Sequence, residues 1–453
     1  MKTLPHSQVR DTALLSIINF HSLIKKIWKT ARASILWGGL CSLPPIHAVS
    51  LPEVLSEALQ THPSIQTQQR QVDVSRVDRR VAEQQFFPTP SVSVEQVSPS
   101  AADPSYRGDK QLQLFRLQQP LWTAGRLSAG LDKSQASIDV SEANLADARL
   151  QLSLRVLQAW SDWVASLRKV QAVQESLVAH RRLDDILKRR IQEGASAPTE
   201  QILTESRIQQ TQAQLEMMQA QTRLARVRLE QLIGRNLDAQ DQPRTLAPYA
   251  TELLDQMLAS AVRFFPAYLR GQAQLRSQEA EWLERKADLS PEIYVRAEHQ
   301  RGNFAYVGTP SVNRVFVGLA SRLGAGMSTG IQLESIAKRR EVLLSDLENV
   351  ERSVREQVQT EWIQLNSAMA RLPSLRQSLT SARLTAQAWD RQFLAGRKSW
   401  MEVMNTVREL MQADLDLVDA EMQVFLGSWR LACLVETPDM ALNKMQQEGA
   451  ARP

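Results

Sequence analysis

Hydrophobic and polar residues follow two periods along the chain, and their order predicts a series of elements. Apolar residues at helical spacing predict a helix over about residues 50 to 85, which Pro88 would end because proline lacks the backbone N–H that a helix needs. Alternation with period two predicts a strand at Ser91–Glu95 and a returning strand at residues 110 to 121. We expect a loop between these two strands, at about residues 98 to 109.

The longest predicted helix follows these strands. Residues 125 to 193 contain no proline, and their apolar residues keep the spacing of a coiled coil. At 1.5 Å per residue, a helix of this length would extend over roughly 100 Å. A turn at Gly194 then leads into a shorter helix over about residues 198 to 233.

The second half of the chain repeats this order, which indicates an internal duplication. The repeat predicts a helix at about residues 251 to 288, strands at 293 to 298 and 314 to 319, a long helix at about 330 to 395 that Pro373 interrupts, and a helix at 398 to 434. Identical residues recur in the same order. Leu55, Ala58, Pro63, Pro88, Trp160, Gly194 and Glu200 match Leu258, Ala261, Pro266, Pro291, Trp362, Gly396 and Glu402.

The number of strands constrains the assembly. Four strands cannot close a barrel, and open strand edges in hydrocarbon would leave backbone groups unpaired at a cost of about several kcal/mol each. Two chains would give eight strands, whose interior fills with side chains, whereas three chains give twelve strands and a lumen. We therefore predict a mainly α fold with a small β part, in which a long α-helical barrel continues into a twelve-stranded β-barrel shared by a trimer.

The first 48 residues account for the excess of basic over acidic residues in the chain. Residues 1–48 combine basic residues with a short apolar run, as a signal peptide does, and they hold six of the 54 basic residues but one of the 49 acidic ones. The rest is near neutral, so the overall pI of about 9.3 does not indicate nucleic-acid binding. After this signal peptide we expect a first structural repeat at residues 49–240, a second at 241–436 and a flexible tail at 437–453.

Candidate chemistry is sparse. Cys41 lies in the signal segment, so Cys433 is the one cysteine that would remain, which excludes an intramolecular disulfide and a multi-cysteine metal site. His62, His180 and His299 lie in three different predicted elements. We expect no catalytic site, no metal site and no cofactor.

The duplication, the segment Gln119–Gly125 after the first strand pair, and the turns at Gly194 and Gly396 resemble the TolC family of outer-membrane efflux proteins. The resemblance covers about residues 50 to 436. It implies a homotrimer whose β-barrel lies in outer-membrane lipid and whose helical tunnel lies in the periplasm. It also implies a periplasmic adaptor (membrane fusion protein) and an inner-membrane ABC or other transporter as partners, and no nucleic acid.

The resemblance suggests docking of the adaptor at the two helix tips. The candidate residues are Gly194 and Ala195 at the first tip, and Gly396 and Arg397 at the second. Glycine at these turns allows a left-handed backbone and a close approach of partner helices.

A second set of candidates lies at the periplasmic aperture: Glu402, Asn405 and Glu200. The best-known member of the family has acidic residues six and nine positions after the second tip glycine, which are Glu402 and Asn405 here, so a charged ring would be reduced. Three copies of Glu402 would form a ring that favours cations. Alternatively, Glu402 pairs with Lys398, four positions earlier. A further departure is Arg322, which stands where the family often has proline after the second strand pair.

We therefore expect a passive outer-membrane duct in a tripartite export system. Leu40 precedes Cys41 where a lipoprotein signal needs a small residue, so we expect no lipidation there. This feature and the segment Ala395–Trp400 resemble members that serve type I secretion of large adhesins. The alternatives are the outer-membrane component of a small-molecule (drug) efflux pump, a periplasmic adaptor, and a secreted coiled-coil structural protein. No constellation of residues favours an enzyme.

Overall fold

The computed structural model describes residues 48–98, 103–238, 242–244, 247–249, 253–322 and 324–450. These residues belong to one unit that begins at Ala48. Apart from Ala48, the predicted signal peptide lies outside the described residues. No helix in the described ranges is long and apolar enough to cross a membrane.

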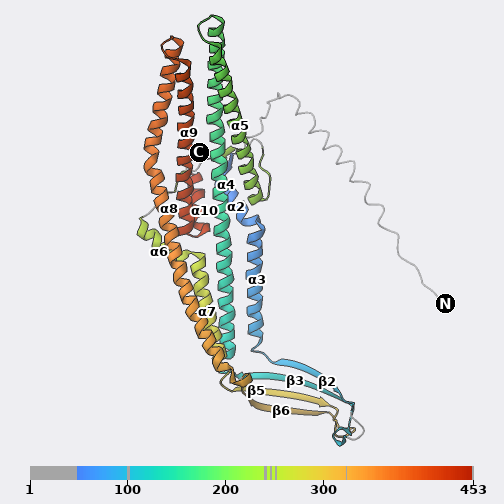
Figure 1. Ribbon diagram of the computed structural model, residues 1–453. Helices are drawn as coiled ribbons and strands as arrows, with labels where there is room; N and C mark the ends of the chain where they lie inside the picture. The colour runs from blue at the N-terminus through green and yellow to red at the C-terminus, as the bar shows by residue number, and fades with distance from the viewer. Residues whose placement is uncertain are drawn as a thin grey trace, which may run out of the picture. The chain divides into compact units, whose positions relative to one another are not determined.

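The first half of this unit contains three strands and four α-helices in the predicted order (Figure 1). They are β1 (Ala48–Ser50), α2 (Leu51–Thr61), α3 (Pro63–Gln84), β2 (Thr89–Gln96), β3 (Gln111–Trp122), α4 (Arg126–Gln192) and α5 (Pro198–Ile233). A short 3-10 helix, Pro104–Tyr106, lies between β2 and β3.

The second half repeats this arrangement and adds a final helix. Its elements are β4 (Gln242–Arg244), α6 (Leu254–Phe264), α7 (Pro266–Ala287), β5 (Glu292–Arg301), β6 (Val312–Ala320), a 3-10 helix (Ala325–Met327), α8 (Thr329–Leu394), α9 (Trp400–Val435) and α10 (Pro438–Ala450). The mainly α fold with four paired barrel-type strands and an internal duplication is therefore as predicted. In Figure 1, the turns that join α4 to α5 and α8 to α9 lie at one end, and β2, β3, β5 and β6 lie at the other.

Proline explains where the helices differ from the prediction. The helices expected at 50–85 and 251–288 are each divided in two, because Pro63 and Pro266 begin new helices and the residues before them, His62 and Phe265, have extended backbones. Pro373, which we expected to interrupt its helix, lies inside the continuous α8. An internal proline costs about 3 kcal/mol, and contacts with α9 support α8 on both sides of it, where Arg371 donates to Gln423 and Arg376 to Glu421.

The four longer strands form one antiparallel sheet in the order β2-β3-β5-β6. The register pairs Val92 with Phe115 and Phe115 with His299, so residues far apart in the sequence share a face. A bulge between Pro120 and Trp122 marks the end of β3 next to the helices, where proline cannot donate a ladder hydrogen bond.

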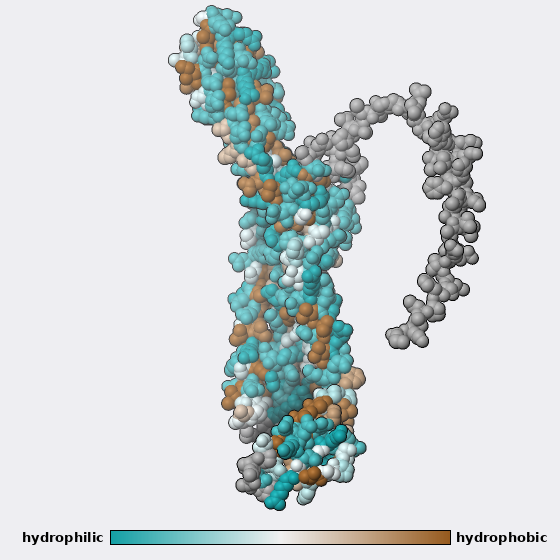
Figure 2. Space-filling model, turned by 90° about the vertical axis from the view of Figure 1, so that its right-hand side faces the viewer, coloured by the Kyte–Doolittle hydropathy of each residue, from teal (hydrophilic) through white to brown (hydrophobic). Residues whose placement is uncertain are grey.

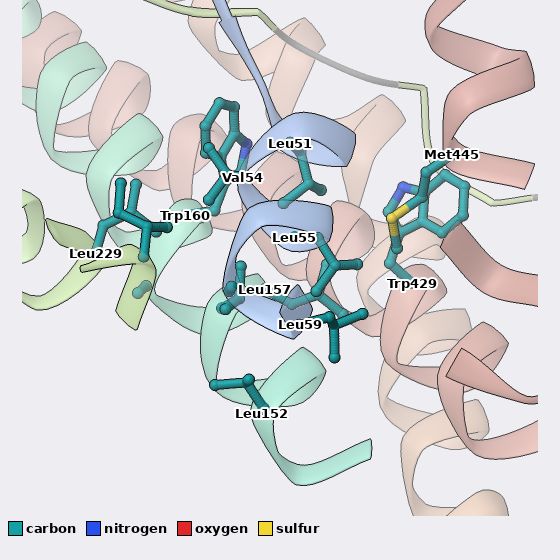
Figure 3. Close-up of a cluster of buried hydrophobic side chains, with 14 of the residues drawn as sticks. Leu51, Val54, Leu55, Leu59, Leu152, Leu157, Trp160, Leu229, Trp429 and Met445 are labelled. Atoms are coloured by element: carbon teal, nitrogen blue, oxygen red, sulfur yellow. The ribbon is translucent and has the colours of Figure 1, made fainter. Parts of the chain in front are cut away.

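A hydrophobic core joins the two halves near the middle of the helices (Figure 3). Leu55 of α2, Trp160 of α4 and Trp429 of α9 are buried there. The Trp429 indole N–H donates a hydrogen bond of 3.1 Å to the Ala247 carbonyl, so the polar edge of this ring is satisfied. Trp362, the repeat equivalent of Trp160, is partly buried against a second cluster on α6, α8 and α9. Both tryptophans therefore pack between helices.

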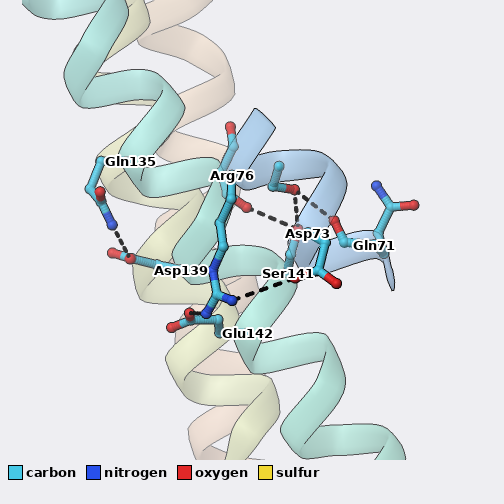
Figure 4. A network of polar contacts seen from close by, with 9 residues as sticks. Gln71, Asp73, Arg76, Gln135, Asp139, Ser141 and Glu142 are labelled. Carbon is cyan, nitrogen blue, oxygen red and sulfur yellow. Dashed lines mark hydrogen bonds and ion pairs between the residues drawn. The ribbon is translucent and has the colours of Figure 1, made fainter. Parts of the chain in front are cut away.

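Polar contacts join the helices closer to the sheet. Ser75 of α3 and Ser141 of α4 are buried with their hydroxyl oxygens 2.8 Å apart, and Arg76 reaches Glu142 at 3.0 Å (Figure 4). Such small side chains let helix backbones approach closely. The surface of the helices in Figure 2 is mostly hydrophilic with scattered hydrophobic residues, as expected for helices that contact water on more than one side.

The end of the chain corrects one expectation. We expected a flexible tail at 437–453, but Pro438–Ala450 form α10, which packs against α2, α4 and α9. Ala441 and Met445 are fully buried in the core shared with Leu55 and Trp429. Lys444 also pairs with Glu436, so both apolar burial and an ion pair hold this helix in place.

Replacing Met445 with alanine should therefore destabilise the protein by about 2–5 kcal/mol, because it removes a fully buried side chain and leaves a cavity. Met440→Ala on the same helix is the matched control, since Met440 is 51% exposed and its loss should cost less than about 0.5 kcal/mol. Denaturant unfolding of both variants measures the difference. Equal stabilities would show that α10 does not pack on the core.

Candidate functional site

The two helix tips have the same backbone geometry. Gly194 (φ 75°) and Gly396 (φ 72°) are left-handed residues that directly follow the last turns of α4 and α8. The next residue donates back into the helix in each case: Ala195 N–H to the Arg190 carbonyl at 2.7 Å, and Arg397 N–H to the Gln392 carbonyl at 2.8 Å. These hydrogen bonds satisfy carbonyls that the helix end leaves free. The four predicted tip residues are all exposed.

The tips are held side by side by contacts between α4 and α8. The guanidinium of Arg190 lies 5.0 Å from the centre of the Phe393 ring and donates to the Phe393 carbonyl at 3.3 Å. Arg182 pairs with Asp390 at 3.1 Å. A small core that includes Leu187, Phe393 and Trp400 lies between the two hairpins. The structure therefore brings both predicted docking turns to one end of the molecule.

Glu402 is engaged at the start of α9. Its carboxylate accepts hydrogen bonds from Lys398 Nζ at 2.6 Å and from the Ser399 N–H at 2.9 Å, while Ser399 Oγ accepts from the Glu402 N–H at 3.3 Å. Lys398 also lies 4.2 Å from the centre of the Trp389 ring. The hydrogen bond from Lys398, followed by those from Ser399, lowers the pKa of Glu402 to about 2. The pairing with Lys398 is thus present, and a ring of free Glu402 carboxylates stays a prediction.

The other two aperture candidates have simpler surroundings. Asn405 lies half-buried one turn beyond Glu402 on α9. Glu200 occupies the first turn of α5, as Glu402 does on α9. The capping residue before α5 is Ala197, whose side chain has no oxygen to accept from the helix N–H groups. The repeat-equivalent acids are therefore held differently.

A groove of about 300 Å³ lies between α4, α8 and α9, between the tips and the central core. Its lining combines apolar side chains such as Val407 and Met411 with the charged Glu175, Arg182 and Asp414. Burial, followed by the nearby Glu175, raises the pKa of Asp414. Sequence reasoning missed this groove because its lining comes from three helices in both halves of the chain.

The sheet has two different faces. Apolar residues from all four strands gather on one face, as the register shows. They are the exposed Val92, Val94, Phe115, Leu117, Val315, Val317 and Leu319 and the half-buried Ile293 and Val295. Charged residues lie on the opposite face, where Arg116 pairs with Glu298 at 3.0 Å. A sheet with one apolar and one polar face fits a boundary between lipid and water.

His62, His180 and His299 do not belong to a metal-binding group. Among the described residues, no group of His, Cys, Asp and Glu could hold a metal ion. His180 is buried between α4 and α5, with Nδ1 3.1 Å from Thr211 Oγ1. Burial, and then the charge of Arg207, lowers the pKa of His180 to about 4, so the ring is neutral at neutral pH. It contributes to helix packing rather than to chemistry.

Comparisons with known proteins agree with this arrangement of long helical hairpins at one end and a sheet with an apolar face at the other. The family described as "Outer membrane efflux protein" matches residues 54–235, inside the first repeat. The chain is 21% identical over 329 residues to the outer membrane efflux protein BepC of Brucella suis, covering 70% of each chain. It is 24% identical over 335 residues to the alkaline protease secretion protein AprF of Pseudomonas aeruginosa, covering 71% of this chain and 68% of AprF.

The solved structures show the same fold. The outer membrane protein VceC of Vibrio cholerae superposes with a TM-score of 0.74 at 14% identity, covering 85% of this chain and 95% of VceC. These matches confirm the resemblance to outer-membrane efflux proteins of the TolC type that the sequence predicted. The matched family is described by outer-membrane efflux and CusC by transmembrane channel formation, which agrees with the expectation that the chain is not an enzyme.

Glu402→Gln should lower the melting temperature at neutral pH. The pKa is near 4.5 in the unfolded chain and about 2 in the folded one, so the stabilisation is complete above pH 4.5 and is lost as pH falls towards 2. The difference in melting temperature between wild type and variant should stay constant down to about pH 5 and then shrink. Glu200→Gln, at the uncapped equivalent, should have a smaller effect. A difference that persists at pH 2 would contradict this account.

Proposed function

We propose that three copies of this chain form a passive outer-membrane duct through which a partner pump exports its cargo. The observation that carries the proposal is the division of the chain into two ends: a sheet with an apolar face at one end and two exposed glycine turns at the other (Figure 1). The apolar face fits lipid, and the hydrophilic helices fit the aqueous periplasm.

Copies must pool their strands because the sheet is open. Strands β2 and β6 are its edges, and four strands are too few to close a barrel around a lumen. The two edges run in opposite directions because every neighbouring pair in the sheet is antiparallel. An edge β6 can therefore pair with the β2 of the next copy in the same antiparallel manner, and three copies give twelve strands.

The tips are the proposed docking sites for a periplasmic adaptor, which would connect the duct to an inner-membrane ABC or other transporter. Gly194 and Gly396 have open space around the position of a Cβ atom, so partner backbones can approach them closely. Ala195 and Arg397 follow these glycines and are exposed beside them.

The cargo we propose is protein, exported by type I secretion. The similarity to AprF, named for the secretion of alkaline protease, supports this choice. A large adhesin is the cargo class suggested by the segment Ala395–Trp400 of the second tip. Small-molecule efflux is the second candidate, supported by the similarity to the efflux protein BepC.

The topology predicts which ends are accessible from outside the cell. The two hairpin loops are joined by hydrogen bonds from Gly108 N–H to the Phe304 carbonyl and from Asp109 N–H to the Asn303 carbonyl, so they form one surface. An epitope tag inserted at the exposed Ser105 should be labelled on intact cells. The same tag inserted at Gly194 should be labelled only after the outer membrane is permeabilised. Labelling in the reverse order would contradict the proposed orientation.

The docking proposal predicts that bulky residues at both tip glycines abolish export while trimers still form. Gly194→Trp with Gly396→Trp is the test variant, assayed by export and by gel migration of the unheated trimer. Gly234→Trp is the matched control, because Gly234 (φ 77°) also ends a helix in the left-handed conformation with open space around it. Equal losses in both variants would trace the defect to backbone strain rather than to docking.

A further inference from the structure

Three arginines form a belt on the polar face of the sheet. This arginine belt consists of Arg116 on β3, Arg296 on β5 and Arg314 on β6. The register places Arg116, Glu298 and Arg314 in one row across three strands. Arg296 precedes Glu298 by two positions, so it lies on the same face.

The carboxylate of Glu298 forms ion pairs with two arginines of this belt. Glu298 Oε1 lies 3.0 Å from Arg116 Nε and 2.9 Å from Arg296 Nε. Arg314 instead donates to the Gln300 side-chain carbonyl at 3.0 Å. The belt therefore has an excess of two positive charges in each chain. The Glu298 side chain is only 9% exposed while that of Arg116 is 44% exposed, so the arginine presents more of its surface to the solvent.

Aromatic rings position the central arginine. The Arg296 guanidinium lies 4.9 Å from the centre of the Phe316 ring and 5.8 Å from that of Tyr294. The Tyr294 ring occupies the space above Gly318, where a Cβ atom would come within 2.4 Å of it. Arg296 is thus held by cation–π contacts that do not neutralise its charge.

The other charges on this face do not offset the belt locally. Glu95 lies four residues beyond Ser91, which pairs with Arg116, so it is roughly 13 Å further towards the loops. At the end of the sheet next to the helices, Glu292 is paired with both Arg126 at 3.0 Å and Arg322 at 3.3 Å. This cluster contains two arginines and one glutamate, so its net charge is also positive.

We infer that the arginine belt faces the lumen of the assembled channel and makes its β-barrel select for anions, both small inorganic anions and the carboxylate or phosphate groups of cargo. The inference rests on the proposed trimer, in which the apolar face contacts lipid and three copies of the belt surround one axis. Charges of one sign in a confined passage reinforce each other's field and concentrate counter-ions. At the opposite end, Glu402 is paired with Lys398, which offsets the charge of that carboxylate.

Planar-bilayer recordings of the purified trimer in a KCl gradient test this inference. The chloride-to-potassium permeability ratio should exceed one near 0.1 M salt and fall towards one at 1 M, because the Debye length shrinks from about 10 Å to about 3 Å. The triple variant Arg116→Gln, Arg296→Gln and Arg314→Gln should lower the ratio at least about two-fold. Glu298→Gln should raise it, because it removes the one carboxylate of the belt.

The matched control is Arg301→Gln, which removes the same charge from β5. Arg301 lies opposite Gln113 in the strand register, and this places it on the apolar face of the sheet. Its permeability ratio should equal that of wild type. A wild-type ratio at or below one, or a triple variant with an unchanged ratio, would overturn the inference while the channel itself stands. Should the triple variant fail to assemble, Arg314→Gln alone and the salt dependence of wild type decide. Absence of any conductance from the purified wild-type protein would instead contradict the proposed function.

Discussion

The open edges of the sheet are the constraint on which the rest of the structure depends. Strands β2 and β6 each pair on one side only within the described chain, which leaves a row of backbone N–H and C=O groups on the other side. In hydrocarbon each unpaired group would cost about several kcal/mol, so an apolar face on such a sheet is compatible with lipid only if the edges are paired with other copies. The even number of strands makes that pairing antiparallel.

The long helices are held together by contacts between their side chains. Long helices with water on more than one side cannot be held by a single apolar face, so the stabilising contacts are concentrated at two levels. One is the core of Leu55, Trp160 and Trp429, which α10 completes with Met445. The other is the cluster at the tips, where Phe393 and Trp400 join the two hairpins. Closer to the sheet, the Ser75–Ser141 contact joins α3 to α4 through polar side chains.

Local signals predicted most of this fold, and long-range contacts explain what they missed. Prolines and period-two alternation located the strands to within a few residues, and a spacing of four suggested the Lys398–Glu402 pair. The breaks at Pro63 and Pro266 were missed because apolar helical spacing continues across them. Helix α10 was missed because only its packing on the core makes so short a segment stable. The arginine belt depends on strand register, which one segment of sequence does not reveal.

The most direct test of the account is a disulfide scan between the two edge strands of separate copies. Ser93→Cys on the polar face of β2 would be combined with a cysteine at Val312, Arg314 or Phe316 on the same face of β6. Background is low, because Cys433 is buried and burial raises its pKa to about 12. At least one pair should give cross-linked dimers and trimers in outer membranes after mild oxidation. Monomers alone from every pair would contradict the shared barrel.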